Sequence, residues 1–185
     1  SVYELKAYVE NIFLRLGLNM RNLVVGNLTD DIYAAALSVQ TKGGKRLATF
    51  GIVTKKILKA FDIDNEVYYA DLNWKELMKA IRSVKISYAE ISKFPAVKRD
   101  LALLVDKKVQ FAEIEKIAYE TEKKLLKDVS LFDVYEGKNL EAGKKSYAVS
   151  FLLQDENQTL NDKMIDKIMS KLVKNLEDKL DAKLR

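Results

Sequence analysis

The strongest constraint on the fold is a pair of strand-like segments, residues 131–137 and 143–153, joined by a short loop between two glycines. In the second segment, apolar residues recur at every other position: Tyr147, Val149, Phe151 and Leu153. Between them lie small or hydroxyl-bearing residues: Ser146, Ala148 and Ser150. Because side chains alternate between the two faces of a β-strand, this pattern predicts a strand with one face on a core and the other facing solvent.

The first segment, Leu-Phe-Asp-Val-Tyr-Glu-Gly, is divided into two faces by the same rule. Phe132 and Val134 would share one face. Asp133 and Tyr135 would share the other, beside Ser146 of the neighbouring strand. A surface with an aromatic ring, a carboxylate and a hydroxyl group can hold an unstacked nucleotide base. It can also be the solvated side of an ordinary sheet, and the alternation alone favours that simpler interpretation.

The second half of the chain alternates between strand-like and helix-like patterns. In chain order, the spacing predicts a strand over 100–105, a helix over 111–127, strands over 129–135 and 146–153, a helix over 160–177 and a short strand over 180–184. This βαββαβ order is the ferredoxin-like pattern, in which we expect two amphipathic helices to cover one face of the sheet. Thr159, with Asp162 three residues later, resembles a capping box and predicts the start of the second helix.

The first half predicts a second α+β arrangement. Its expected elements are a helix over 3–16, strands over 32–40 and 46–53, a helix over 56–61, a strand over 66–72 and a helix over 74–81. Gly43 and Gly44 lie among basic residues, but they lack the spacing of a phosphate-binding loop and join two strands, so they predict a hairpin turn. We therefore expect an α+β chain with three parts: a domain over 1–84, a linker over 85–98 with the only proline, and a domain over 99–185.

The composition excludes several kinds of chemistry. The 185 residues include no cysteine and no histidine, which removes thiolate chemistry and the commonest general base and metal ligand. We therefore expect neither a cofactor nor a metal site. The net charge of +5 favours polyanions only weakly, because the lysines are scattered among acidic residues. No segment has the pattern of a membrane span or a signal peptide, and we expect a cytoplasmic protein.

Five short motifs follow one another in the second half: Phe-Pro-Ala-Val-Lys-Arg-Asp-Leu-Ala at 94–102, Leu-Phe-Asp-Val-Tyr-Glu-Gly at 131–137, Gly-Lys-Lys-Ser at 143–146, Leu-Gln-Asp at 153–155 and Thr-Leu at 159–160. Together they resemble the anticodon-binding domain at the C-terminus of the bacterial phenylalanyl-tRNA synthetase β subunit. The first half resembles the end of the preceding synthetase-like domain of that subunit. It departs from the family's Gly-x-x-Gly-x-x-His-Pro run, since Thr54 and Lys55 replace the His-Pro pair after the Gly51 strand.

The resemblance implies that the open face of the sheet grips the anticodon loop of tRNA(Phe). Tyr135 would stack on an anticodon base, Asp133 would accept hydrogen bonds from a guanine edge, and Ser146 would add a polar contact. Basic residues are expected to flank this face and to contact phosphates: Arg99, Lys138, Lys144 and Lys145. No residue of the chain would be catalytic.

The resemblance also implies an assembly. In the family, the β subunit joins an α subunit in a heterotetramer that attaches phenylalanine to tRNA(Phe) with ATP and Mg²⁺, and the α subunit performs the catalysis. We expect this chain to be a C-terminal fragment of such a ligase subunit, with its first half as a structural interface and with no DNA or membrane partner. The alternative is a ferredoxin-like regulatory module that binds a small molecule such as an amino acid. Such modules usually have a glycine-rich loop after the first strand, whereas residues 106–109 are Asp-Lys-Lys-Val.

Overall fold

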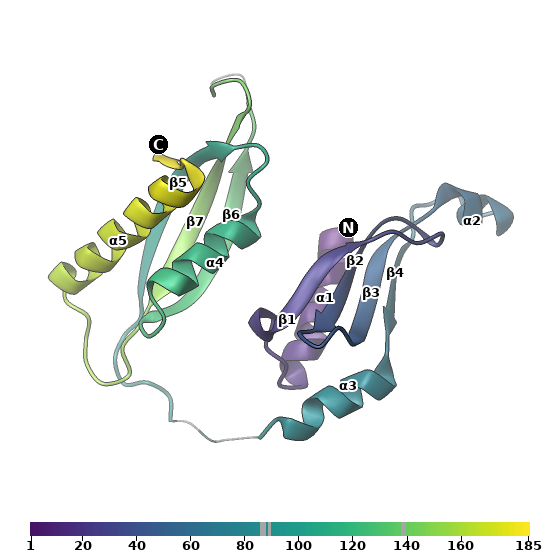
Figure 1. Cartoon of the computed structure of the whole chain (residues 1–185), viewed down its shortest axis with the longest axis horizontal. Helices are drawn as coiled ribbons and strands as arrows, with labels where there is room; N and C mark the ends of the chain where they lie inside the picture. The colour runs from purple at the N-terminus through teal and green to yellow at the C-terminus, as the bar shows by residue number, and fades with distance from the viewer. Residues whose placement is uncertain (86–87, 89, 138–139) are drawn as a thin grey trace. The chain divides into compact units, whose positions relative to one another are not determined.

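The computed structural model of the chain describes residues 1–85, 88, 90–137 and 140–185. They form two compact units, Ser1–Ala89 and Glu90–Arg185, each with its own sheet and helices (Figure 1). The division falls within the linker expected over 85–98. The first strand of the second unit already begins at Val97, so the last two residues of that linker belong to the sheet.

The first unit is built on an antiparallel sheet. Its elements are α1 (Val2–Arg15), a 3₁₀ turn (Met20–Asn22), β1 (Leu23–Leu28), β2 (Tyr33–Thr41), β3 (Arg46–Val53), α2 (Lys55–Ala60), β4 (Tyr68–Leu72), α3 (Trp74–Ala80) and a second 3₁₀ turn (Ile81–Ser83). The strands lie in the order β1-β2-β3-β4, each antiparallel to the next. The sequence prediction lacks β1, because adjacent Val24 and Val25, followed by Gly26, break the alternation that marks a strand.

The amphipathic helix α1 supplies much of the core of the first unit. Its buried residues, Val9 and Phe13, belong to one apolar cluster with Leu47 and Phe50 of β3. Full burial of an apolar side chain of this size stabilises a fold by about 1.5–3 kcal/mol. The helix is therefore held on the sheet by its apolar face.

The second unit has the expected ferredoxin-like βαββαβ order. Its elements are β5 (Val97–Asp106), α4 (Phe111–Thr121), β6 (Leu126–Tyr135), β7 (Lys144–Leu153), α5 (Asp162–Leu180) and β8 (Lys183–Leu184). The strands lie in the order β6-β7-β5-β8, and all neighbours are antiparallel. Both helices lie on the same side of this sheet (Figure 1). The α+β class and the ferredoxin-like pattern are thus confirmed.

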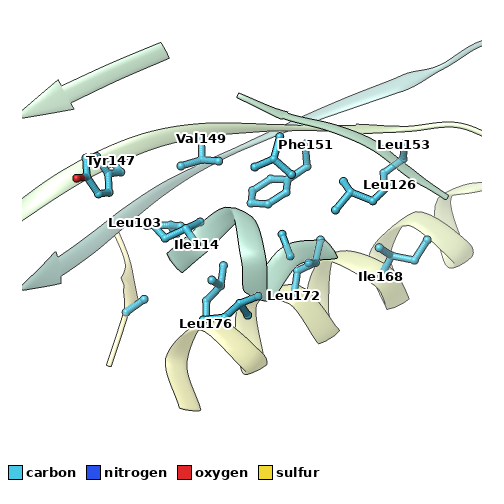
Figure 2. Packing of buried hydrophobic residues seen from close by; sticks show 14 of the residues in the cluster. Leu103, Ile114, Leu126, Tyr147, Val149, Phe151, Leu153, Ile168, Leu172 and Leu176 are labelled. Atoms are coloured by element: carbon cyan, nitrogen blue, oxygen red, sulfur yellow. The ribbon is translucent and has the colours of Figure 1, made fainter. Parts of the chain in front are cut away.

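The core of the second unit lies between the sheet and these two helices (Figure 2). The alternating row predicted from the sequence is buried as a whole: Tyr147, Val149, Phe151 and Leu153. Figure 2 shows these side chains pointing toward Ile114 of α4 and toward Leu172 and Leu176 of α5. Because one face of β7 is committed to this core, every intervening residue is directed to the other face.

Helix α4 is shorter than its predicted range of 111–127, since it ends at Thr121. The Glu122 carboxylate accepts hydrogen bonds from the backbone N–H groups of Lys124 (2.9 Å) and Leu125 (3.0 Å), which turns the chain away from the helix. Lys171 of α5 donates to the Thr121 carbonyl oxygen at 3.2 Å, so this end of the helix is also satisfied from outside. Because α4 ends at Thr121, strand β6 begins at Leu126, within the range predicted to be helical.

Helix α5 begins two residues later than predicted, at Asp162. Asn161 is its N-cap, and the Asn161 side chain accepts a hydrogen bond from the Met164 N–H at 2.9 Å. The expectation that Thr159 caps the helix is therefore wrong, because Asn161 lies closer to the first turn and provides the same kind of acceptor. At the other end, Asp181 adopts a left-handed conformation (φ 50°) and turns the chain into β8.

Candidate functional site

The candidate site is the face of the second sheet that points away from α4 and α5, which we call the open face. Directly paired residues of antiparallel strands share a face. The pairing therefore assigns alternate residues of three strands to the open face: Lys98, Asp100, Ala102, Leu104 and Asp106 of β5, Lys144, Ser146, Ala148, Ser150 and Leu152 of β7, and Asp128, Ser130, Asp133 and Tyr135 of β6. Within the described part of this unit, both helices lie on the opposite face.

The register brings together the three residues predicted to contact a base. Tyr135 pairs with Ser146, and Asp133 pairs with Ala148. Tyr135 is 37% exposed and Asp133 is exposed, whereas Ser146 is buried in the floor between the strands. Two small residues lie beside them, Ala148 and its pairing partner Ala102. The sheet thus presents a ring, a carboxylate and a hydroxyl group side by side.

A β-bulge in β6 changes the predicted position of Phe132. The pairing passes from Leu131 opposite Val149 to Asp133 opposite Ala148, so Phe132 is an extra residue in the strand. Its ring is 58% exposed and lies 5.7 Å from Nζ of Lys98, a residue of the open face. The prediction that Phe132 shares the face of Val134 is therefore wrong, because strict alternation fails at a bulge.

Arg185 is a residue of this face that the sequence analysis missed. Its backbone N–H donates to the Ala102 carbonyl oxygen at 3.0 Å, which extends the pairing of β8 with β5. Its guanidinium carbon lies 5.3 Å from the centroid of the Tyr135 ring. A cation over an aromatic face is attracted by the ring quadrupole. The only sequence signal was a basic residue directly after the short predicted strand.

Gly137 leaves room for the ring of Tyr135. A Cβ atom built on Gly137 would lie 2.2 Å from the Tyr135 hydroxyl oxygen and 2.3 Å from the adjacent ring carbon. Contacts this short are not tolerated, so any larger residue would force the ring to move. The glycine that ends the Leu-Phe-Asp-Val-Tyr-Glu-Gly motif therefore provides the space in which the ring lies.

Two of the predicted phosphate contacts lie on the helix side of the sheet. Arg99 pairs with Phe151, and its guanidinium is 4.0 Å from the Asp162 carboxylate at the start of α5. Lys145 is only 8% exposed, and its ammonium lies 4.6 Å from the ring centroid of Tyr147. The expectation that Arg99 and Lys145 flank the open face is wrong. Each lies next to an open-face residue in its strand, and adjacent side chains of a strand point to opposite faces.

The other two predicted phosphate contacts have different positions. Lys144 is the first residue of β7 and is largely covered, with Nζ 3.4 Å from the carboxylate of Asp181. Lys138 lies outside the described residues. Among the described residues, the pairing and the alternation place four cations on or over the open face: Lys98, Lys144, which lies two residues before Ser146, Lys183, which pairs with Leu104, and Arg185.

Other motif residues stabilise the surrounding backbone. The Gln154 side chain donates to the Phe94 carbonyl oxygen at 2.8 Å, which ties the segment before β5 to the end of β7. Asp155 accepts a hydrogen bond from the Asn157 N–H at 2.9 Å, and this backbone contact holds the pKa of the Asp155 carboxyl below its ordinary value. The motifs thus combine residues that face solvent on the sheet with residues that fix the loops around it.

Neither metal nor membrane features were found in the described residues. No group of three or more Asp or Glu side chains there is arranged to hold a metal ion. None of the helices in the described ranges has the length and hydrophobicity needed to cross a bilayer.

Two family models match the chain. The model described as "Ferredoxin-fold anticodon binding domain" matches residues 92–185, which lie in the second unit. The model described as "Phenylalanyl tRNA synthetase beta chain CLM domain" matches residues 1–74, which lie in the first unit. Both matches confirm the resemblance that the motifs predicted.

Curated proteins are similar to the chain along its entire length. The "Phenylalanine--tRNA ligase beta subunit" of Bacteroides fragilis (strain ATCC 25285) is 90% identical over 185 residues, which is 100% of this chain and 23% of that protein. The proteins of the same name from Bacteroides thetaiotaomicron and Porphyromonas gingivalis are 89% and 52% identical, with the same coverage. The chain therefore spans less than a quarter of these relatives. On these matches, the chain belongs to the phenylalanyl-tRNA synthetase β-chain family, and its second unit is a ferredoxin-fold anticodon binding domain.

Proposed function

We propose that the open face of the second unit binds the anticodon loop of tRNA(Phe). The observation that carries the proposal is the grouping of the exposed Tyr135 and Asp133 with the buried Ser146 on one face of the sheet. Proteins that bind single-stranded RNA loops splay the bases out, stack them on aromatic rings and hydrogen-bond their edges. The open face offers each of these elements.

Each of the three side chains has a distinct role in this proposal. The ring of Tyr135 stacks on one anticodon base. The carboxylate of Asp133 accepts hydrogen bonds from the N–H groups on the Watson–Crick edge of guanine, since a carboxylate offers acceptors only. Ser146 adds a contact from the adjacent strand, directly opposite Tyr135. The guanidinium of Arg185, 5.3 Å from the centroid of the Tyr135 ring, places a positive charge beside this stacking position.

Contacts with the RNA backbone follow from the cations of the open face. Lys98, Lys183 and Arg185 supply positive charge there, and such contacts orient RNA without reading its sequence. Lys144 joins them only by leaving its ion pair with Asp181. Arg99 and Lys145 would reach a phosphate only from the helix side, which makes them weaker candidates than the sequence suggested.

We also infer that the chain acts within a ligase that attaches phenylalanine to tRNA(Phe) with ATP and Mg²⁺, in an assembly of α and β subunits. The relatives are named as the beta subunit of such a ligase. In this assembly the chain contributes RNA recognition, and its first unit acts as an interface. Exposed apolar side chains on α1 support that second role: Tyr3, Tyr8 and Leu14.

A calorimetric titration tests the proposal. The chain is titrated with the anticodon stem-loop of tRNA(Phe), with the same hairpin carrying a changed anticodon, and with free phenylalanine. We expect the tightest binding to the first hairpin and no binding of phenylalanine. Tyr135→Ala should weaken binding of the first hairpin by about 1–3 kcal/mol, as expected for a lost base stack, and should affect the second hairpin less.

Val134→Ala is the matched control, because Val134 lies on the same strand and pairs with Tyr147 on the core face. It should leave RNA affinity unchanged. An equal loss on both hairpins for Tyr135→Ala, or no loss on either, would contradict the stacking role. Binding of phenylalanine without binding of RNA would support the regulatory module instead.

A further inference from the structure

A second aromatic side chain occupies the open face. The bulge in β6 sets Phe132 and Asp133 together opposite the single residue Ala148, so both side chains are presented to the same surface. The Lys98 ammonium lies 5.7 Å from the Phe132 ring centroid. This pair repeats the arrangement of Arg185 over Tyr135. The open face therefore has two exposed rings, each with a cation over it.

A row of polar groups lies next to Phe132. Asp100, Ser150 and Ser130 face one another directly across three strands. Ser150 is 3% exposed, and its hydroxyl donates to one carboxylate oxygen of Asp100. Asp100 is exposed, and its second carboxylate oxygen has no hydrogen-bond partner among the described residues. This row lies two residues along β7 from Ala148, which is about 7 Å for an extended strand. A polar acceptor thus accompanies the second ring, as Asp133 accompanies Tyr135.

We propose that Phe132 forms a second base-stacking subsite, which takes the nucleotide next to the one on Tyr135, and that Asp100 accepts a hydrogen bond from the exocyclic amino group of that base. The proposal rests on the proposed function, because it concerns the same bound RNA. An isolated apolar residue on a surface needs no explanation. Phe132 differs in having a cation, an available carboxylate and a neighbouring aromatic ring on one face.

The chemistry of Asp100 selects among the bases. A carboxylate only accepts hydrogen bonds, so it favours a base edge that donates through an amino group. Adenine, cytosine and guanine have such a group, whereas the single N–H on the pairing edge of uracil is flanked by two carbonyl oxygens. By Watson–Crick complementarity, an anticodon for the phenylalanine codon UUC is G-A-A. With the guanine beside Asp133 and its 3′ neighbour on Phe132, the base at the Phe132 subsite is an adenine.

Fluorescent RNA hairpins test the stacking part of the proposal. 2-Aminopurine, whose fluorescence falls when it stacks, is placed at each anticodon position in turn and the hairpin is titrated with the chain. We expect stacking signals at two neighbouring positions. Phe132→Leu should remove the signal at one position and weaken binding roughly tenfold, while Tyr135→Leu should remove the signal at the other. An unchanged signal at both positions in Phe132→Leu would overturn the proposal.

The failure of this subsite is distinguishable from the failure of the proposed function. If Tyr135→Leu weakens binding and Phe132→Leu does not, the anticodon assignment stands and the second subsite is lost. If the wild-type chain gives no stacking signal and no binding at any position, both are lost. Val134→Ala again controls for strand β6, and thermal melting of each variant shows whether the second unit is folded.

The role of Asp100 has its own test. Replacement of the adenine at the Phe132 position by purine, which lacks the amino group, should weaken binding to the wild-type chain at least about tenfold, as for one lost hydrogen bond to a charged group. Asp100→Ala should bind the adenine and purine hairpins equally. If Asp100→Ala keeps the full discrimination, its carboxylate does not contact the amino group.

Discussion

Two tyrosine–cation pairs lie on opposite faces of the second sheet. On the helix side, the Lys145 ammonium is 4.6 Å from the ring centroid of Tyr147, and the Tyr147 hydroxyl donates to the Val109 carbonyl oxygen at 3.2 Å. On the open face, Arg185 lies 5.3 Å from the ring centroid of Tyr135. The same chemistry therefore serves two purposes. The buried pair joins the sheet to the loop after β5, whereas the exposed pair is available to a ligand.

The largest expected difference between the faces concerns stability. Phe151→Ala removes a fully buried ring from the core and should lower the free energy of unfolding of the second unit by about 3–5 kcal/mol. Tyr135→Ala should lower it by less than about 1 kcal/mol, since the side chain is partly exposed. Denaturant unfolding followed by circular dichroism measures both changes. Tryptophan fluorescence would report on the first unit instead, because the only tryptophan, Trp74, lies there. Equal losses of unfolding free energy in the two variants would contradict the assignment of one face to the core and the other to solvent.

A smaller difference concerns the two tyrosine hydroxyl groups. Tyr147→Phe leaves the Val109 carbonyl oxygen without its partner and should cost about 1–3 kcal/mol of stability. Tyr135→Phe should cost less than about 0.5 kcal/mol, the range of ordinary surface substitutions. The same unfolding experiment compares the two. A larger cost for Tyr135→Phe would show that its hydroxyl has a structural role that the open-face position does not suggest.

The smallest expected difference is in the salt dependence of RNA binding. Arg185→Gln should reduce the slope of log affinity against log salt concentration by about 0.7, as for one lost phosphate contact on a single strand. Lys145→Gln should leave the slope unchanged, because its ammonium lies on the helix side over Tyr147. Affinities for the anticodon hairpin at several salt concentrations provide the measurement. If Lys145→Gln also reduces the slope, then RNA reaches both faces.

The sequence predicted the features of this sheet that depend on regular alternation. The row from Tyr147 to Leu153 fixed the buried face of β7, and the opposite parity placed Ser146 on the open face. The same alternation, applied to β7 and β5, would also have assigned Lys145 and Arg99 to the helix side. Their basic character and their place near the motifs suggested an RNA contact, whereas strand geometry determines which way they point.

Features that depend on pairing between distant segments were not predictable in the same way. The bulge at Phe132 arises from the match between β6 and β7, and no residue in the strand marks it. Arg185 reaches Tyr135 because β8 pairs with β5, although the two residues belong to the opposite edges of the sheet. At the end of α4, the Thr121 carbonyl oxygen accepts a hydrogen bond from Lys171, fifty residues away. Each of these is a tertiary effect.

The bulge in β6 increases the number of side chains that this strand directs to the open face. A regular strand directs only half of its side chains to either face. With Phe132 removed, the residues around it would form an unbroken alternation in which Asp133 and Tyr135 keep their places. The inserted residue therefore raises the number of outward groups without moving those already present. A sheet can in this way gain a recognition element by the insertion of one residue, at no cost to the register of its core.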